Sequence, residues 1–84
     1  MMLLWASLAW EDYLFWQTTD KKTLSRVNRL IKDIQRDPFA GIGDPEPLKH
    51  AWTGYWSRRI DKEHRIVYKV ENQTVYIAQC RYHY

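Results

Sequence analysis

The most regular pattern of hydrophobic and polar positions lies between Asp20 and Asp37. Apolar residues recur there at intervals of three and four, as they do along the buried stripe of an α-helix. Asp20 can cap the N-terminus of this helix. Asp37 ends it, because the residue before Pro38 is pushed out of the α region. We therefore predict a helix that ends near Arg36 and whose buried face carries Leu24, Val27, Leu30, Ile31 and Ile34.

The first twenty residues contain two weaker patterns. Residues 2–6 form a short apolar run, which is typical of a buried strand. Ser7 can cap a helix that begins at about Leu8, and the polar run at residues 18–20 ends it. The residues at helical spacing in this segment are Trp10, Tyr13, Leu14 and Gln17.

A long loop and three strands follow the second helix. Residues 37–47 contain all three prolines and two of the three glycines, a composition typical of a loop. Residues 55–60, 64–70 and 74–82 are rich in aromatic and β-branched side chains, and polar turns separate them. The order β-α-α-β-β-β predicts a single α+β domain over residues 1–84. Its two helices pack on one face of a mainly antiparallel, twisted sheet.

Alternation along the first two of these strands divides their side chains between two faces. If the apolar residues face the helices, Arg59 and Arg65 share the opposite face, together with Ser57 and Lys69. The inward positions are then Trp56, Ile60, Ile66, Tyr68 and Val70.

The last strand allows two assignments. We place Tyr76, Ala78 and Cys80 inward, although Val75 and Ile77 would also suit a core. The first assignment sends His83 to the helix-free face. On this interpretation His83 joins the two outward arginines there.

The net charge of +3 is unevenly distributed. Residues 1–45 carry six Lys and Arg against six Asp and Glu, whereas residues 46–84 carry seven against four. A basic second half suits a polyanion, through phosphate contacts and counterion release, or an acidic protein partner. An ordinary solvated basic surface would have the same composition.

Cysteine content and hydropathy indicate the compartment. Cys80 is the only cysteine, so no intrachain disulfide can form, which fits a reducing compartment. We find no signal peptide and no membrane span, since the apolar run at residues 2–6 is short and acidic residues follow it. We expect a cytoplasmic protein without a membrane partner.

The second half holds the groups that cleavage of RNA by its own 2′-hydroxyl needs. That reaction requires a base for the hydroxyl proton, cations for the phosphorane and an acid for the 5′-oxygen. Glu46 is a candidate base and His83 a candidate acid, and the candidate phosphate ligands are Lys49, Arg59 and Arg65.

Other roles remain open for the same residues. Glu46 could be a solvated loop acid, Arg65 could pair with Glu63, and Tyr84 could stack on a base or cap the sheet. The histidines and Cys80 show no metal-ligand spacing, and no glycine-rich phosphate loop is present. We therefore expect no metal and no cofactor.

Six blocks of the sequence carry a family resemblance. They are AWEDY at 9–13, DPF at 37–39, EPLKH at 46–50, GYWSRRI at 54–60, EHRIVY at 63–68 and CRYHY at 80–84. In this order they are similar to the YoeB toxins of bacterial toxin–antitoxin systems, within the RelE superfamily. The resemblance covers the whole chain.

The resemblance implies an activity and a set of site residues. It implies an mRNA interferase that cuts mRNA in the A site of the 70S ribosome and inhibits translation, with a YefM-like antitoxin whose acidic C-terminal segment neutralises it. It implies a RelE-like fold and, for some relatives, a homodimer. The residues at matching positions are Glu46 as general base, His83 as general acid and Arg65 as phosphate stabiliser, with Lys49, His50 and Arg59 in support and Tyr84 in stacking or positioning.

A second hypothesis belongs to another class of protein. A non-catalytic module of the same fold could bind RNA or protein through its basic face. The presence of both Glu46 and His83 favours the enzyme, because binding alone needs only the cations.

Overall fold

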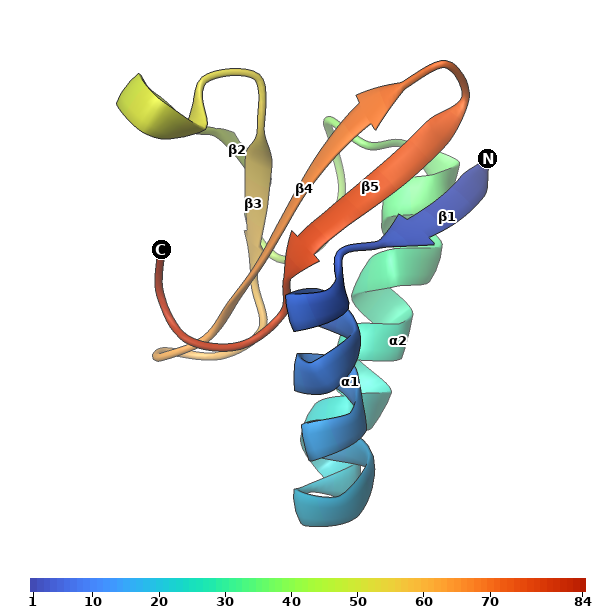
Figure 1. Cartoon of the computed structure of the whole chain (residues 1–84), viewed down its shortest axis with the longest axis vertical. Helices are drawn as coiled ribbons and strands as arrows, with labels where there is room; N and C mark the ends of the chain where they lie inside the picture. The colour runs from blue at the N-terminus through green and yellow to red at the C-terminus, as the bar shows by residue number, and fades with distance from the viewer.

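The computed structural model describes residues 1–84, which fold into two α-helices, five strands and one turn of 3₁₀-helix (Figure 1). In chain order the elements are β1 (Met2–Trp5), α1 (Ser7–Thr19), α2 (Lys21–Arg36), β2 (Glu46–Pro47), η1 (His50–Trp52), β3 (Trp56–Arg59), β4 (Arg65–Glu71) and β5 (Thr74–Gln79).

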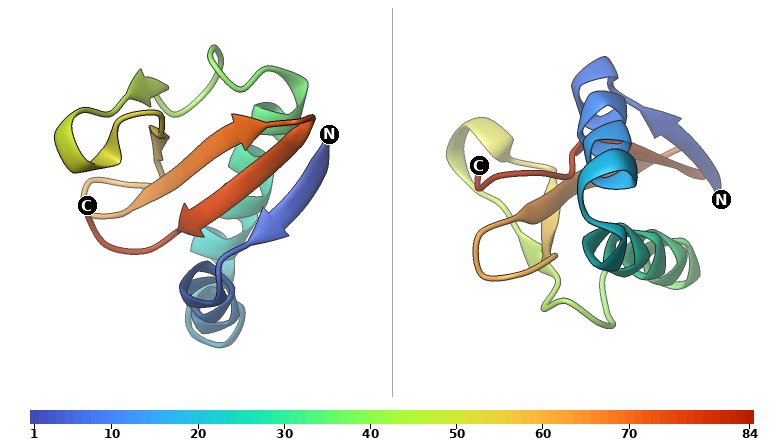
Figure 2. Two further views of the ribbon diagram at one scale, coloured as in Figure 1. Left: turned by 45° about the horizontal axis from the view of Figure 1, so that its top comes forward. Right: turned by 90° about the horizontal axis from the view of Figure 1, so that it is seen from below.

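The strands form one sheet in the order β1-β5-β4-β3-β2. β1 runs parallel to β5, and every other neighbouring pair is antiparallel. Both helices lie on one side of this sheet, as the two rotated views show (Figure 2). The predicted α+β class, with two helices packed on a mainly antiparallel sheet, is confirmed.

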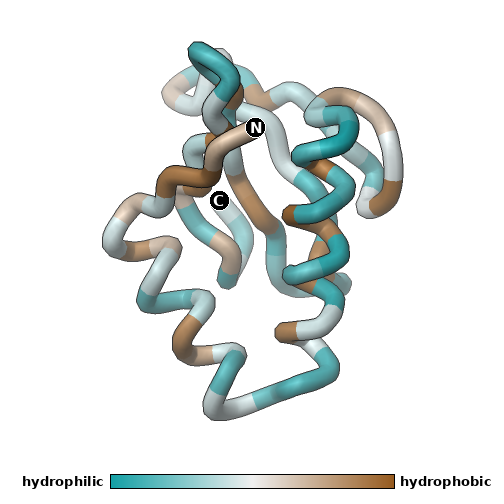
Figure 3. The backbone as a smooth tube through the Cα atoms, turned by 90° about the vertical axis from the view of Figure 1, so that its right-hand side faces the viewer, coloured by the Kyte–Doolittle hydropathy of each residue, from teal (hydrophilic) through white to brown (hydrophobic).

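The apolar stripe of α2 explains its position. Val27, Leu30 and Ile34 are fully buried against the sheet, and hydrophobic positions alternate with polar ones along the helix (Figure 3). Asp20 caps the helix as predicted, since its side chain accepts the Thr23 N–H at 3.1 Å. The helix ends at Arg36, directly before the Asp37–Pro38 dipeptide.

The predicted cap of α1 is wrong. Ser7 is the first helical residue, and Ala6 precedes it without any side-chain cap. The Ala6 N–H donates to the Ile77 carbonyl at 2.9 Å, so the chain stays bonded to the sheet until the helix begins. The buried side of α1 then carries Ala9, Asp12 and Trp16.

The predicted facing of β5 is also wrong for most of the strand. Val75 and Ile77 lie in the core, while Tyr76 and Ala78 do not. Tyr68 of β4 is paired with Ile77 of β5, and the next pair is Val67 with Gln79. Between these pairs β4 contributes one step and β5 contributes two. The extra residue is a β-bulge, which shifts the alternation by one position. Cys80 therefore faces the core as predicted, although Val75 and Ile77 do so too.

Apart from shifts of one residue, the extent of the strands differs from the prediction in two places. β5 ends at Gln79 rather than at residue 82, and the last five residues leave the sheet. The predicted loop over residues 37–47 contains the short strand β2 at its end, which pairs with β3. The facing predicted for β3 and β4 is confirmed, because the core includes Ile60, Ile66 and Tyr68, with Trp56 and Val70 packed against it.

Neither helix is both long enough and apolar enough to cross a membrane.

Candidate active site

Strand register brings three of the predicted site residues to the same face of the sheet. Glu46 in β2 is paired with Ser57 in β3, and Arg59 is paired with Arg65 in β4. Residues paired across strands share a face, and so do residues two apart along one strand. Glu46, Arg59 and Arg65 therefore lie on the helix-free face, as predicted for the two arginines.

A cavity of about 470 Å³ opens beside this face. It gathers four of the seven predicted site residues although they come from both ends of the second half of the chain. Its lining consists of Glu46, Pro47, Leu48, Lys49, His50, Ala51, Trp52 and Tyr84. We call it the cleft.

A closed loop presents the central part of the cleft. Leu48 is buried, and its N–H donates to the Tyr55 carbonyl at 2.9 Å, which joins the two ends of the loop. His50 begins η1 with φ of 59°, in the left-handed region that few non-glycine residues adopt. The Thr53 hydroxyl and N–H both donate to the His50 carbonyl, at 2.7 and 3.1 Å, and hold this turn.

The charged groups of the site are largely unpaired with one another. Glu46 and Lys49 are exposed and form no salt bridge. The Arg59 guanidinium lies 3.8 Å from Asp44, with both side chains mostly exposed. The Arg65 guanidinium donates to the backbone carbonyl of Asp61 at 2.8 Å and does not pair with a carboxylate. These cations are therefore free to meet an anion.

The last two residues lie at the edge of the cleft. Tyr84 lines it, and the His83 ring stacks on the Tyr84 ring with centroids 4.7 Å apart. The His83 Nδ1 lies 3.1 Å from the Tyr84 carbonyl oxygen, and both side chains are exposed. His83 is thus next to the cleft but does not line it.

Residues 80–84, which we call the tail, reach the cleft through contacts that sequence reasoning missed. Asp12 in α1 accepts the Cys80 N–H at 3.1 Å, and the Trp16 indole N–H donates to the Cys80 carbonyl at 2.8 Å. The His64 Nδ1 accepts the Tyr82 N–H at 2.7 Å. One signal was available in the sequence: Asp12 falls on the same helical face as Ala9 and Trp16, where a carboxylate needs a partner.

Burial raises the pKa of two groups that hold the tail, Asp12 and Cys80. Desolvation raises the pKa of Asp12 above its ordinary value, and the Cys80 N–H that it accepts only partly offsets this. Burial, with the Asp12 charge in second place, raises the pKa of the Cys80 thiol to about 12. Cys80 is therefore a buried thiol, as predicted, and it stays protonated at neutral pH.

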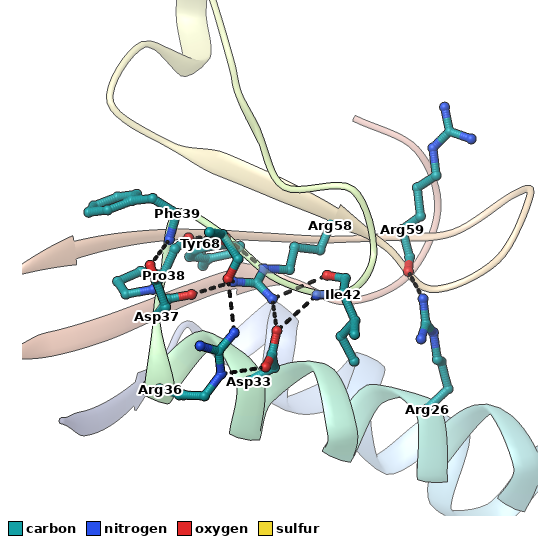
Figure 4. A network of polar contacts seen from close by, with 11 residues as sticks. Arg26, Asp33, Arg36, Asp37, Pro38, Phe39, Ile42, Arg58, Arg59 and Tyr68 are labelled. Atoms are coloured by element: carbon teal, nitrogen blue, oxygen red, sulfur yellow. Dashed lines mark hydrogen bonds and ion pairs between the residues drawn. The ribbon is translucent and has the colours of Figure 1, made fainter.

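Arg58 does not belong to the site, although its sequence neighbour does. Its side chain is fully buried, so Arg58 is not a surface charge. The guanidinium donates to the Asp33 carboxylate at 2.6 Å and to the Tyr68 hydroxyl at 3.1 Å. It also donates to three backbone carbonyls of the loop after α2, namely those of Asp37, Ala40 and Ile42 (Figure 4). We call this network the loop clamp.

Asp33 and Tyr68 complete the loop clamp. Hydrogen bonds from Arg36, from the Ile42 N–H and from Arg58 hold the pKa of Asp33 far below its ordinary value. Burial raises the pKa of Tyr68, whose hydroxyl donates to the Pro38 carbonyl at 2.6 Å. The clamp thus fixes the loop that leads into β2, and so the approach of Glu46 to the sheet.

The arrangement of donors also limits what the site can hold. No three side chains of His, Cys, Asp or Glu lie close enough to share a metal ion. The cleft lining offers instead one carboxylate, one ammonium group, one imidazole and two aromatic rings, and Arg59 and Arg65 lie on the neighbouring strands. Such a set can bind a phosphate and exchange protons with it.

Comparison with known proteins agrees with the fold. A family model described as a YoeB-like toxin of bacterial type II toxin–antitoxin systems matches residues 5–84. The chain is 56% identical to the toxin YoeB of Escherichia coli strain K12 over 84 residues, which is the full length of both.

Solved structures give the same answer. A YoeB/ParE toxin from Agrobacterium tumefaciens superposes with a TM-score of 0.97 at 49% identity, with 100% of both chains covered. YoeB from Staphylococcus aureus superposes with a TM-score of 0.92 at 46% identity, over 100% of this chain and 98% of the other. It has been solved as a heterotetrameric complex with YefM and as a dimer.

The fold and the cleft define a small α+β domain in which Glu46 shares one face of the sheet with Arg59 and Arg65. The chain belongs to the family of YoeB-like toxins of bacterial type II toxin–antitoxin systems.

Proposed function

We propose that the protein is a ribosome-dependent endoribonuclease that cleaves mRNA in the ribosomal A site and so inhibits translation. The observation that supports this most is the cleft, which Glu46, Lys49 and His50 line together with Tyr84, a residue more than thirty positions later in the chain. Arg59 and Arg65 stand on the same side of the sheet without carboxylate partners closer than 3.8 Å. Membership of the toxin family supports the same activity.

Each group has a role in the proposed reaction. The Glu46 carboxylate takes the proton of the 2′-hydroxyl, whose oxygen then attacks the adjacent phosphorus. Arg65, aided by Arg59 and Lys49, stabilises the charge that develops on the phosphorane oxygens. The 5′-oxygen leaves with a proton from the imidazolium form of His83, which becomes a neutral imidazole. His50 and Tyr84 position the nucleotide, Tyr84 by stacking on a base.

In this mechanism the protein's own side chains carry the acid–base steps without a metal ion or cofactor. A positioned acid and a positioned base each contribute about 10²–10⁴-fold. Arginine suits the phosphorane because its planar fork can meet two oxygens at once, whereas lysine acts as a point charge.

The proposed partners follow from charge and family. In the cytoplasm, a YefM-like antitoxin with an acidic segment would neutralise the basic residues around the cleft. The Staphylococcus aureus relative forms a complex with YefM, which supports this partner, and its dimer supports a homodimer here as well.

The chemistry of the product ends tests this proposal. Programmed 70S ribosomes, with Mg²⁺ kept because ribosomes need it, are incubated with the protein, and the cut mRNA is analysed. We expect a 2′,3′-cyclic phosphate or 3′-phosphate on one fragment and a 5′-hydroxyl on the other, and no cleavage of the same mRNA without ribosomes.

Two results would contradict it. Fragments with a 5′-phosphate would exclude attack by the 2′-hydroxyl. Intact mRNA on ribosomes that bind the protein would favour the non-catalytic module instead. Glu46→Gln is the matched control, because it keeps the size of the side chain, removes the proposed base and leaves the cations in place.

A further inference from the structure

The tail after β5 is tightly bonded although it belongs to no strand. Cys80 is held through both of its backbone groups by Asp12 and Trp16 of α1. Tyr82 is held in the same way from the other side: its N–H donates to the His64 Nδ1, and its carbonyl accepts the Arg65 N–H at 2.9 Å. The chain between β5 and the cleft is therefore fixed at two points.

Tyr82 needs this support because of its backbone conformation. Its φ is 64°, in the left-handed region, which bulky residues seldom adopt unless their surroundings impose it. This turn redirects the tail from α1 toward η1, where the views of Figure 2 place the C-terminus. Whatever holds Tyr82 therefore sets the direction in which the last two residues leave.

The His64 ring is itself fixed. It packs edge-on against the Trp16 indole, with centroids 4.9 Å apart, and its side chain is only 13% exposed. Nδ1 can accept the Tyr82 N–H only when it carries no proton, so the ring is the neutral Nε2–H tautomer. Its Nε2 lies 3.9 Å from the exposed Glu63 carboxylate.

Beyond Tyr82 the tail has little support of its own. The polar contact of His83 is with the adjacent Tyr84 carbonyl, and its ring stacks on the Tyr84 ring. Tyr84 reaches the cleft lining only two residues after the bond to His64. The placement of both proposed catalytic-site residues thus depends on the anchor at Tyr82.

We propose that His64 is a positioning residue: its unprotonated Nδ1 holds the Tyr82 backbone so that His83 and Tyr84 reach the cleft. This rests on the proposed function. His64 itself does not touch the RNA.

Three substitutions at one position isolate the acceptor atom. His64→Asn places an oxygen at the same number of bonds from Cα as Nδ1, so it can accept the Tyr82 N–H. His64→Gln places its oxygen where Nε2 was, out of reach of that N–H. His64→Ala removes both. Glu63→Gln is the control, because it changes the Nε2 side of the ring and leaves Nδ1 alone.

Amide hydrogen exchange of Tyr82, measured by NMR on the protein alone, reads the anchor directly. In His64→Ala and His64→Gln the Tyr82 amide should exchange about 2- to 10-fold faster, as expected for the loss of one hydrogen bond. His64→Asn and Glu63→Gln should match wild type. Unchanged exchange in His64→Gln would overturn the anchor without reference to activity.

Single-turnover cleavage on saturating ribosome complexes reads the positioning. A tail displaced by about 1 Å should slow cleavage by up to about 10²-fold in His64→Ala and His64→Gln, with ribosome affinity unchanged. His64→Asn should restore most of the rate. Thermal melts check the fold, and the Asn–Gln pair keeps the test valid if His64→Ala unfolds, because both variants fill the site.

Failure of this proposal and failure of the proposed function give different results. If wild type cleaves and His64→Gln cleaves within about threefold of it, well short of the range for misplacement, His64 is not a positioning residue. If wild type leaves mRNA intact, the proposed function is wrong and the positioning role is overturned with it, while the exchange rates still report whether the anchor exists.

Discussion

Arg58 and Arg59 are neighbours in β3 with opposite surroundings. Arg58 is fully buried, and its guanidinium donates to Asp33, Tyr68 and three loop carbonyls. The Arg59 side chain is 60% exposed, and its guanidinium has one distant carboxylate neighbour, Asp44 at 3.8 Å. One position along a strand turns a side chain to the other face. An arginine at position 58 therefore holds the loop clamp, whereas the arginine at position 59 lies on the face beside the cleft.

The two regions divide stability from reactivity. The loop clamp satisfies a buried charge completely, which makes it costly to break and leaves nothing to bind a ligand. On the cleft side Glu46 and Lys49 are exposed without a salt bridge, and the Arg59–Asp44 ion pair is long and exposed, so removing one of these charges should cost little stability. Substitutions in the two regions should therefore separate folding from cleavage.

Deletion of His83 and Tyr84 should give the largest effect. The bonds that hold the tail end at Tyr82, so the fold should melt near the wild-type temperature while cleavage falls by about 10²–10⁴-fold, the contribution of a general acid. Single-turnover rates on saturating ribosome complexes measure this loss, with thermal melts as the folding control. Cleavage within about threefold of wild type, well below that range, would show that His83 is not the acid.

Arg58→Ala should produce the largest loss of stability. Removing one member of a buried ion pair costs about 3–5 kcal/mol, because the partner groups are left without donors. Urea unfolding followed by tryptophan fluorescence measures the change. Arg59→Ala is the matched control at the next position, and it should stay within about 0.5 kcal/mol of wild type. Equal losses of unfolding free energy in the two variants would show that the two arginines do not differ in their contribution to stability.

Arg65→Ala should show the reverse of Arg58→Ala. We expect cleavage to fall by about 10²–10³-fold, the usual effect of removing one preorganised donor to a developing charge, with little change in unfolding. Arg65→Lys should restore only part of the rate, because an ammonium cannot reproduce the guanidinium fork. If Arg65→Ala cuts programmed ribosomes at the wild-type rate, Arg65 has a structural role only.

The smallest effect concerns pH. The folded pKa of Asp33 lies below its unfolded value, so ionised Asp33 contributes stability above about pH 4. That contribution is lost as pH falls below 4 toward the folded pKa. Asp33→Asn should lower stability at neutral pH and flatten this acid limb in urea titrations.

Asp12 gives the opposite sign for comparison. Burial raises its folded pKa, so its contribution is full below about pH 4 and is lost as pH rises through the folded value. Wild type should therefore lose stability as pH rises through the folded pKa of Asp12, and Asp12→Asn should not show this loss.

For Asp33, an acid limb that is steeper in Asp33→Asn than in wild type would contradict the assignment.

Much of the fold was predictable because local patterns determine it. The stripe from Leu24 to Ile34 and the Asp20 cap are set by neighbouring residues, and the order of the elements along the chain, apart from β2, follows from composition. The outward positions of Arg59 and Arg65 followed from simple alternation. The chemistry of RNA cleavage suggested Glu46 and Lys49, and the family resemblance added His50 and a role for Tyr84. The structure gathers these four residues at one cleft.

What could not be predicted depends on contacts between distant segments. The bulge after Ile77 puts Cys80 on the same side of the sheet as Val75 and Ile77, and no residue there marks it in the sequence. Arg58 and Arg59 are indistinguishable in sequence until Asp33 is known to lie beneath one of them. The anchors of the tail join Asp12 to Cys80 and His64 to Tyr82, pairings that only the folded chain makes.

The parallel pairing of β1 with β5 has a consequence for how the protein is made. Met2 is paired with Thr74, so β1 cannot pair with β5 until a segment about seventy residues later in the chain has been made. Closing such a long loop is slow compared with forming local helices. A chain still emerging during synthesis can form α1 and α2, but it cannot complete the sheet until residues 74–77 are available. Tyr84 follows those residues, so a partly made chain does not yet have the complete cleft.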